Sequence, residues 1–307
     1  MSLLFTFPGQ GAQKPNMLRK LNVNALTQGV FEQASDMLGY NVFDLDSQSA
    51  QKNNKNVQVG LTVCAVACVE LLASEGIQAD YVLGLSIGAF PAAIASKIMS
   101  FEQGLKLVSL RGKLMSEAYP TGYAMAAIIG LPLHKIQVLI HSVNQTHLPV
   151  YLANINTEYQ YIISGPISSL EIICQQARLL QASSAKLMNV NVPSHCLLLE
   201  EQAQSLYQEI QTATFAPPQS TFVSANAARV IFKEDFIKKD LAFNMAQQVK
   251  WWETAAMLNQ RGVSMAIEMA PGSVLSKLCA VSMPSTQCLS IETSSLNSIR
   301  VLADRLS

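Results

Sequence analysis

Residues 80–96, with the sequence DYVLGLSIGAFPAAIAS, decide the expected fold. An apolar run at 81–83 leads into Gly84-Leu85-Ser86-Ile87-Gly88, and an alanine-rich stretch with helical character follows. This is the G-x-S-x-G pattern between a strand and a helix, where the turn is so tight that glycines flank the projecting serine. Ser86 is therefore the candidate nucleophile, although short glycine-serine motifs also arise as plain turns.

The composition predicts a globular protein with a large core. Of the 307 residues, 50% are hydrophobic and only 14% are charged, against a usual charged fraction of about 25%. The 21 lysines and arginines equal the 21 aspartates and glutamates in number. This balance gives no electrostatic case for a nucleic-acid partner or for an anionic membrane surface.

The termini and the cysteines indicate a reduced, cytoplasmic protein. The apolar start at 3–7 breaks at Pro8-Gly9, which is too short for a signal-peptide core. The apolar stretch 57–73 contains several polar residues and is expected to be a buried helix rather than a membrane span. The six cysteines are scattered, and Cys64 and Cys68 lack the spacing of a metal or redox pair. We therefore expect buried thiols and no metal site.

The order of the expected elements predicts an α/β fold with an insertion. Between 124 and 191 the pattern reads β-α-β-β-α-β, which is the ferredoxin-like arrangement. Outside it, strands alternate with helices around the elbow, which predicts a mainly parallel sheet covered on both faces. The expected division is a large domain of 1–122 and 192–307 with a ferredoxin-like subdomain at 123–191. The local expectations include strands at 3–7, 221–225, 263–268 and 287–291, an exposed loop at 48–56, a helix at 194–211, helices through 231–262 and a strand at 185–192.

Arg111 lies in the middle of the apolar face of an expected helix at 102–118. A guanidinium at such a position needs an anionic partner, because an unpaired buried charge costs several kcal/mol. The partner is either an internal carboxylate or a carboxylate of the substrate, bound through two parallel hydrogen bonds.

A serine nucleophile needs a base, and the chain has four histidines, His134, His141, His147 and His195. The first three belong to the expected insertion, whereas His195 lies where the chain returns to the large domain. It is the candidate base, with a capping or packed histidine as the alternative. No aspartate lies between Ser86 and His195, and the chain has no Asp-Gly dipeptide. These absences favour a Ser–His dyad whose histidine is oriented by a backbone carbonyl or an amide.

Seven motifs, in the same order along essentially the whole chain, resemble the malonyl-CoA:acyl carrier protein transacylase family. They are FPGQGAQ at 7–13, the elbow, RGKLM at 111–115, AMAAIIGL at 124–131, N-x-N-x-x-x-Q at 154–160, VPSHC at 192–196 and EMAPG at 268–272. The resemblance implies a hydrolase-like α/β domain with a ferredoxin-like insert. It also implies malonyl-CoA as substrate, the phosphopantetheine-type thiol of an acyl carrier protein as acceptor, and no permanently bound cofactor.

The resemblance also implies catalytic roles. Ser86 would attack the malonyl thioester, and His195 would take its proton and return it to the leaving thiolate. The backbone N–H groups of Gln10 and Ile87 would stabilise the oxyanion.

Further residues would bind the substrate or support the base. Arg111 would bind the free malonyl carboxylate, with Met115 against the acyl chain, and a backbone carbonyl near Lys250 would orient the histidine. The residues expected to line the cleft are Asn154, Asn156 and Gln160.

The elbow departs from the pattern of the fatty-acid-synthesis members, which usually read G-H-S-L-G-E. Here the six residues at 84–89 are GLSIGA. This elbow, the start at 3–8 and VKWWE at 249–253 resemble the epsilon subunit of bacterial malonate decarboxylase, which loads malonyl onto a carrier subunit. That assignment is the main expectation, and the fatty-acid enzyme is the alternative. A serine thioesterase or lipase and an inactive carrier-binding scaffold are the rivals of another class.

Overall fold

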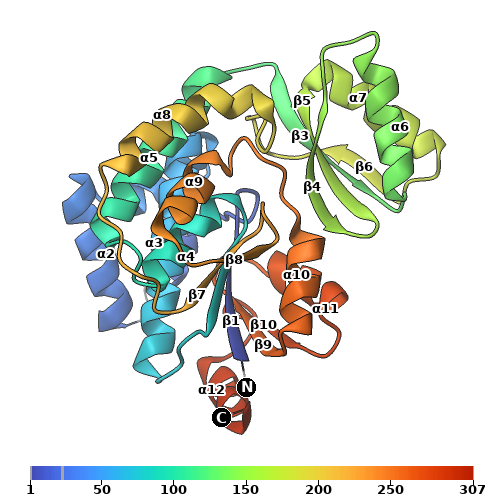
Figure 1. The fold of residues 1–307 in the computed structure, drawn as a ribbon. Coiled ribbons are helices and arrows are strands. Elements are labelled where there is room, and N and C mark those ends of the chain that lie inside the picture. Colours follow the sequence, from blue (N-terminus) through green and yellow to red (C-terminus); the bar gives the residue numbers. More distant parts are fainter. Residues whose placement is uncertain (1, 22–23, 307) are drawn as a thin grey trace.

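The computed structural model describes residues 2–21 and 24–306, and it contains two β-sheets (Figure 1). The larger sheet has the strand order β10-β9-β1-β2-β7-β8, and the smaller has the order β4-β5-β3-β6. The fold is therefore α/β, with a mainly parallel sheet and a small antiparallel one. This confirms the fold class expected from the sequence.

The larger sheet is parallel except at one edge. Its strands are β1 (Ser2–Phe7), β2 (Tyr81–Gly84), β7 (Thr221–Ser224), β8 (Arg229–Ile231), β9 (Val263–Glu268) and β10 (Gln287–Ser290). Only β8 runs antiparallel to its neighbour, β7. Along β1, Phe5 and Phe7 pack into one apolar cluster and Leu4 into another. Both faces of the sheet are therefore covered, as a parallel sheet requires.

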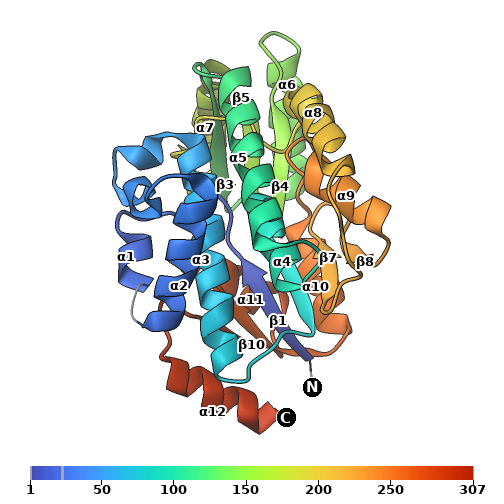
Figure 2. The same ribbon diagram turned by 90° about the vertical axis from the view of Figure 1, so that its left-hand side faces the viewer.

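Helices lie on both sides of this sheet (Figures 1 and 2). They are α1 (Met17–Leu21), α2 (Ala25–Leu38), α3 (Asn54–Ser74), α4 (Ala89–Ala95), α5 (Phe101–Ala118), α8 (Glu200–Gln211), α9 (Glu234–Phe243), α10 (Trp251–Gln260), α11 (Val274–Ser282) and α12 (Leu296–Leu306). The 3-10 turns are η1 (Val42–Asp46), η2 (Ala50–Lys52), η3 (Ser86–Gly88) and η4 (Leu197–Leu199).

The helix α3 is long and apolar enough to cross a membrane, but most of it is buried inside the protein. It packs against α2 and α5, and its residues belong to the main apolar cluster. Such burial is the behaviour of a core helix, and it confirms the buried helix expected for this stretch.

The smaller sheet has the ferredoxin-like order. Its elements are β3 (Tyr123–Ile129), α6 (Leu133–Asn144), β4 (Tyr151–Thr157), β5 (Gln160–Pro166), α7 (Ile167–Leu179) and β6 (Ser184–Leu187). The two helices share one apolar cluster with the sheet, and Met125, Ala153 and Ile162 form another. The strand β4 is tied to the segment before α10, because Ile155 N–H donates to the carbonyl of Val249 at 2.9 Å.

Four local expectations were wrong. The stretch 48–56 contains η2 and the first turn of α3, rather than only an exposed loop. The strand expected at 185–192 is β6, which already ends at Leu187. Residue 231, expected to begin a helix, is instead the last residue of the short edge strand β8. The helix expected from 194 begins only at Glu200, because His195 has a φ of 64° and its N–H donates to the carbonyl of Met245. A residue in the left-handed region cannot lie inside an α-helix.

Candidate active site

The elbow that carries Ser86 is sterically closed to side chains on both sides. Ser86 itself has a φ of 56°, a backbone conformation that costs a non-glycine residue about 1–3 kcal/mol. A Cβ added to Gly84 would lie 2.1 Å from the backbone nitrogen of Ala89, and one added to Gly88 would lie 2.1 Å from the carbonyl oxygen of Phe7. The two glycines are therefore required for the turn, as the G-x-S-x-G pattern predicts.

The loop that follows β1 packs directly against the elbow. Leu85 N–H donates to the carbonyl of Phe7 at 3.0 Å, and a Cβ on Gly9 would lie 2.8 Å from the carbonyl oxygen of Leu85. Within the described part of the chain, the backbone N–H groups of Gln10 and Ile87 donate to no backbone carbonyl. Two free N–H groups beside a serine are the arrangement that stabilises a developing oxyanion.

His195 is held by backbone carbonyls. Its Nδ1 lies 2.7 Å from the carbonyl oxygen of Asn244 and 3.2 Å from that of Gln247. Since a carbonyl can only accept, Nδ1 carries the proton and Nε2 is left as an acceptor. Burial, and next the charge of Arg111, lower the pKa of His195 to about 4, against the opposing effect of the two carbonyls. The imidazole is therefore neutral at pH 7 and able to accept a proton.

The orienting carbonyl was expected near Lys250, and this expectation was wrong. The carbonyl of Lys250 accepts hydrogen bonds from Thr254, at 3.0 Å from its N–H and 2.7 Å from its hydroxyl. It is therefore occupied by the first turn of α10, and Asn244 and Gln247 contact the histidine instead.

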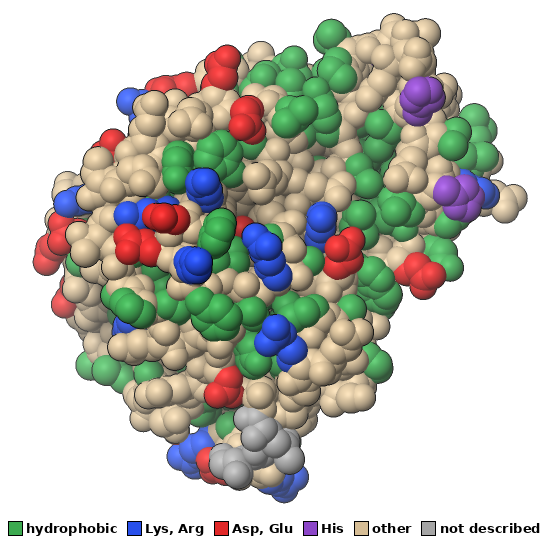
Figure 3. Space-filling view, viewed as in Figure 1, with side chains coloured by type: hydrophobic (Ala, Val, Ile, Leu, Met, Phe, Trp, Pro, Cys, Tyr) green, Lys and Arg blue, Asp and Glu red, His purple; other side chains and the backbone are tan. Residues whose placement is uncertain are grey.

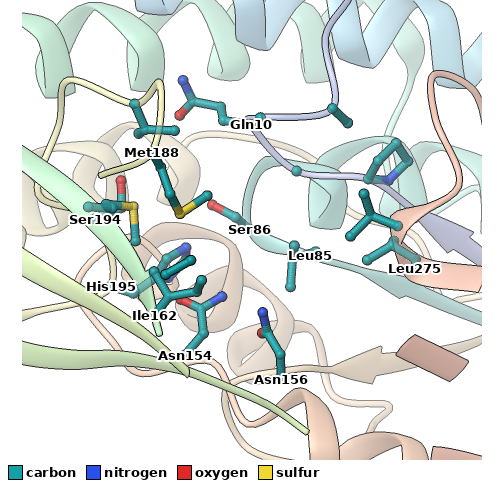
Figure 4. A pocket seen from close by; sticks show the side chains of 18 of the residues that line it. Gln10, Leu85, Ser86, Asn154, Asn156, Ile162, Met188, Ser194, His195 and Leu275 are labelled. Atoms are coloured by element: carbon teal, nitrogen blue, oxygen red, sulfur yellow. The ribbon is translucent and has the colours of Figure 1, made fainter. Parts of the chain in front are cut away.

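Ser86 and His195 line one cavity of about 190 Å³ (Figure 4). They are 9% and 4% exposed. Among the described residues no hydrogen bond joins them, and the Ser86 hydroxyl accepts instead from Nη2 of Arg111 at 3.2 Å. Catalytic hydrogen bonds often form only when substrate is bound, so His195 is still the candidate base because it shares the cavity with Ser86.

Arg111 is completely buried and has only neutral partners. Its Nη1 donates to Oε1 of Gln58 at 2.7 Å, and its Nη2 donates to Oδ1 of Asn244 at 3.0 Å. No ion pair among residues 2–21 and 24–306 includes it, so the internal carboxylate considered from the sequence was wrong. Burial lowers its pKa to about 9, and the guanidinium is still mostly protonated at pH 7.

The other candidate residues divide into two groups. Asn154, Asn156 and Gln160 line the cavity, and the side-chain oxygens of the two asparagines are buried without a partner in the described structure. Arg111 and Met115 are not among the lining residues. Met115 is fully buried, and its sulfur lies 3.3 Å from Nε2 of Gln58.

Two residues of this site were not found from the sequence, Gln58 and Asn244. Gln58 is the one amide in the buried, mostly apolar run 57–68 of α3, and that isolation was a usable signal. Asn244 lies in a polar connection after α9, where an asparagine is unremarkable.

A serine on a glycine-flanked elbow, a histidine held by carbonyls and a parallel sheet with a ferredoxin-like insert define a hydrolase-like α/β protein. Residues 4–296 match the family model described as "Acyl transferase domain". The chain therefore belongs to the acyl transferase domain family.

Relatives and solved structures agree with this assignment. The malonyl CoA-acyl carrier protein transacylase of Escherichia coli K12 is 31% identical over 280 residues, which cover 89% of this chain and 90% of that protein. The protein of the same name from Bacillus subtilis 168 is 29% identical, with 95% and 96% covered. The FabD structure from Acinetobacter baumannii superposes with a TM-score of 0.93 at 30% identity, covering 100% and 99% of the two chains. A malonyl-transacylase in complex with a type II PKS acyl-carrier protein gives 0.92 at 28% identity, covering 100% of both.

Proposed function

We propose that the chain is a malonyl-CoA:acyl carrier protein S-malonyltransferase that works through a seryl-malonyl intermediate. One observation carries the proposal: the buried guanidinium of Arg111 has no carboxylate partner in the described structure and contacts the hydroxyl of Ser86. A malonyl group bears a carboxylate close to the reacting carbonyl, and it would supply the missing anion.

The first half-reaction forms the acyl-enzyme. Ser86 Oγ attacks the thioester carbonyl of malonyl-CoA while Nε2 of His195 takes the hydroxyl proton. The N–H groups of Gln10 and Ile87 would hold the tetrahedral oxyanion, and losing one such donor typically costs about 3 kcal/mol of transition-state stabilisation. The carbon–sulfur bond then breaks, and the imidazolium returns its proton to the CoA thiolate.

The second half-reaction repeats these steps with the carrier thiol. His195 takes the thiol proton, the sulfur attacks the seryl ester, and Ser86 leaves with the proton returned to its oxygen. The products are malonyl-carrier protein and free enzyme. Asn154, Asn156 and Gln160 lie along the cavity and would contact the bound acyl-thioester. Met115 would support the acyl pocket from behind, through its contact with Gln58.

The relatives also bear on the metabolic pathway to which the proposed malonyl transfer belongs. The relatives described above are named malonyl CoA-acyl carrier protein transacylases, and they support the fatty-acid alternative better than the malonate decarboxylase subunit expected first. Leu85, which stands where the fatty-acid-synthesis members usually have a histidine beside the nucleophile, lines the cavity, and its backbone N–H donates to the carbonyl of Phe7. A reducing, cytoplasmic setting is part of the proposal, and the six free thiols are compatible with it.

The test is intact mass spectrometry after mixing the protein with malonyl-CoA. We expect one malonyl adduct on the wild type, none on Ser86→Ala, and a normal adduct on Ser205→Ala, which changes an exposed serine of α8. Addition of a holo-carrier protein should then move the malonyl group to the carrier thiol. Release as free malonate would support the thioesterase or lipase rival, and absence of any adduct would support the scaffold.

A further inference from the structure

We propose that Gln58 and Asn244 form a cage of neutral amides whose purpose is to leave the charge of Arg111 unneutralised, and that this cage sets the selectivity for acyl groups with a free carboxylate. The inference rests on the proposed function, and it assigns a specificity-determining role to two residues outside the Ser–His pair.

The cage contacts both ends of the guanidinium. Gln58 accepts from Nη1 at 2.7 Å and Asn244 accepts from Nη2 at 3.0 Å, and both residues are almost completely buried. A guanidinium has five N–H donors. Nε has no partner in the described structure, so the cage orients the group without using all of its donors.

Neutral acceptors and carboxylates would act differently at these two positions. An amide oxygen accepts a hydrogen bond and fixes the orientation, but it leaves the full positive charge in a low-dielectric site. A carboxylate would accept the same bond and also neutralise the charge. The full charge attracts a substrate carboxylate strongly, whereas an acetyl group would leave the guanidinium without an anion.

The cage also connects the arginine to the rest of the site. Nε2 of Gln58 lies 3.5 Å from the side-chain oxygen of Gln10, whose own amide nitrogen donates to Asn54. On the other side, the backbone carbonyl of Asn244 holds His195 while its side chain holds Arg111. The residue that orients the base therefore also orients the carboxylate-binding group.

The test is Gln58→Glu, which changes one acceptor to a carboxylate of nearly the same shape. Its matched control is Gln175→Glu, the same change at an exposed position of α7. We measure kcat/KM for malonyl-CoA and for acetyl-CoA, together with Tm. Because the variant gives Arg111 an internal carboxylate that competes with the carboxylate of the substrate, malonyl transfer should fall about 10- to 100-fold. Acetyl transfer should change less than about threefold, and Tm should not fall, since the buried charge gains a counterion.

The second variant is Asn244→Asp, which makes the same change at the other nitrogen and keeps the backbone carbonyl that holds His195. It should show the same loss of malonyl-over-acetyl selectivity. Unchanged selectivity in both variants, equal loss of the two activities, or failure of both variants to fold would overturn the inference. Absence of malonyl transfer by the wild type would instead overturn the proposed function, so the two failures are distinguishable.

Discussion

Arg111→Ala separates the two effects that this buried charge has on the site. The charge is expected to bind the substrate carboxylate, and it also lowers the pKa of His195, although burial is the larger cause of that shift. The substitution removes the charge and three hydrogen bonds, to Gln58, Asn244 and Ser86. The two effects give different signatures, one in acyl selectivity and one in the pH profile.

The magnitude for malonyl transfer follows from the lost contacts. A bidentate arginine–carboxylate pair makes two charge-assisted hydrogen bonds, each contributing about 1.5–3 kcal/mol. Removing both should raise the barrier by about 3–6 kcal/mol, which lowers kcat/KM for malonyl-CoA by about two to four orders of magnitude. Acetyl-CoA has no carboxylate, so its transfer should change less than about tenfold.

The pH signature uses the slow acetyl reaction of the same variant. Without the positive charge the protonated imidazole is less disfavoured, so the pKa of His195 rises from about 4. The acidic limb of kcat/KM for acetyl-CoA should move to higher pH in Arg111→Ala. Arg111→Lys keeps the charge and should leave the limb in place, while losing the bidentate geometry and part of the malonyl activity. Equal losses for the two acyl groups with an unmoved limb would mean that the arginine is only structural.

Two further predictions concern stability. Gly88→Ala places a Cβ 2.1 Å from the carbonyl oxygen of Phe7, so the free energy of unfolding measured in urea should fall by about 4 kcal/mol or more. The control is Gly29→Ala in α2, where a Cβ meets no atom within 4 Å and the free energy of unfolding should rise by up to about 1 kcal/mol. Similar urea midpoints for the two variants would contradict the steric argument. The pKa of His195 is lowered from 6.5 to about 4, so the unfolded chain takes up its proton first as the pH falls, and stability is lost between about pH 6.5 and pH 4. The stability difference between wild type and His195→Gln should therefore fall by about 3 kcal/mol from pH 7 to pH 4, and this comparison cancels Asp240, whose pKa burial raises to about 6 and whose effect has the opposite sign. A constant difference across that range would contradict the burial of a neutral histidine.

The elbow and the layered fold could be predicted from the sequence because both are encoded locally. Two glycines around Ser86 indicate a turn with no room for side chains, and the observed clearances agree. The ferredoxin-like insert is readable because its six elements are consecutive and alternate in hydrophobic period. Arg111 could be flagged because a cation on an apolar helix face is anomalous by itself.

The partners of Arg111 and His195 could not be predicted in the same way. Gln58 and Asn244 lie 53 and 133 residues from Arg111 along the chain, and only the packing of α3, α5 and the segment after α9 brings them together. The carbonyl that orients His195 has no sequence signal at all, because every residue carries one. The left-handed conformation of His195, with a φ of 64°, also has no signal in the sequence, and it excludes this residue from the helix expected from 194. The resemblance to the transacylase family implied a carbonyl near Lys250, and the structure has those of Asn244 and Gln247 at the histidine instead.

Some of the buried polar side-chain atoms that lack a partner in the described structure belong to residues of the candidate site. Among the described residues they include Nε of Arg111, Oδ1 of Asn154, Oδ1 of Asn156 and Nδ2 of Asn244. A buried polar atom costs about 1–3 kcal/mol when neither protein, water nor ligand satisfies it. A bound malonyl-thioester offers a carboxylate and one thioester carbonyl as acceptors, and its pantetheine arm offers amide groups as donors and acceptors, which are the complements of these atoms. Hydrogen bonds from these atoms to a bound acyl-thioester would therefore contribute to substrate binding, whereas Gln58, whose side-chain oxygen already accepts from Arg111, would act by leaving the charge of that arginine unneutralised.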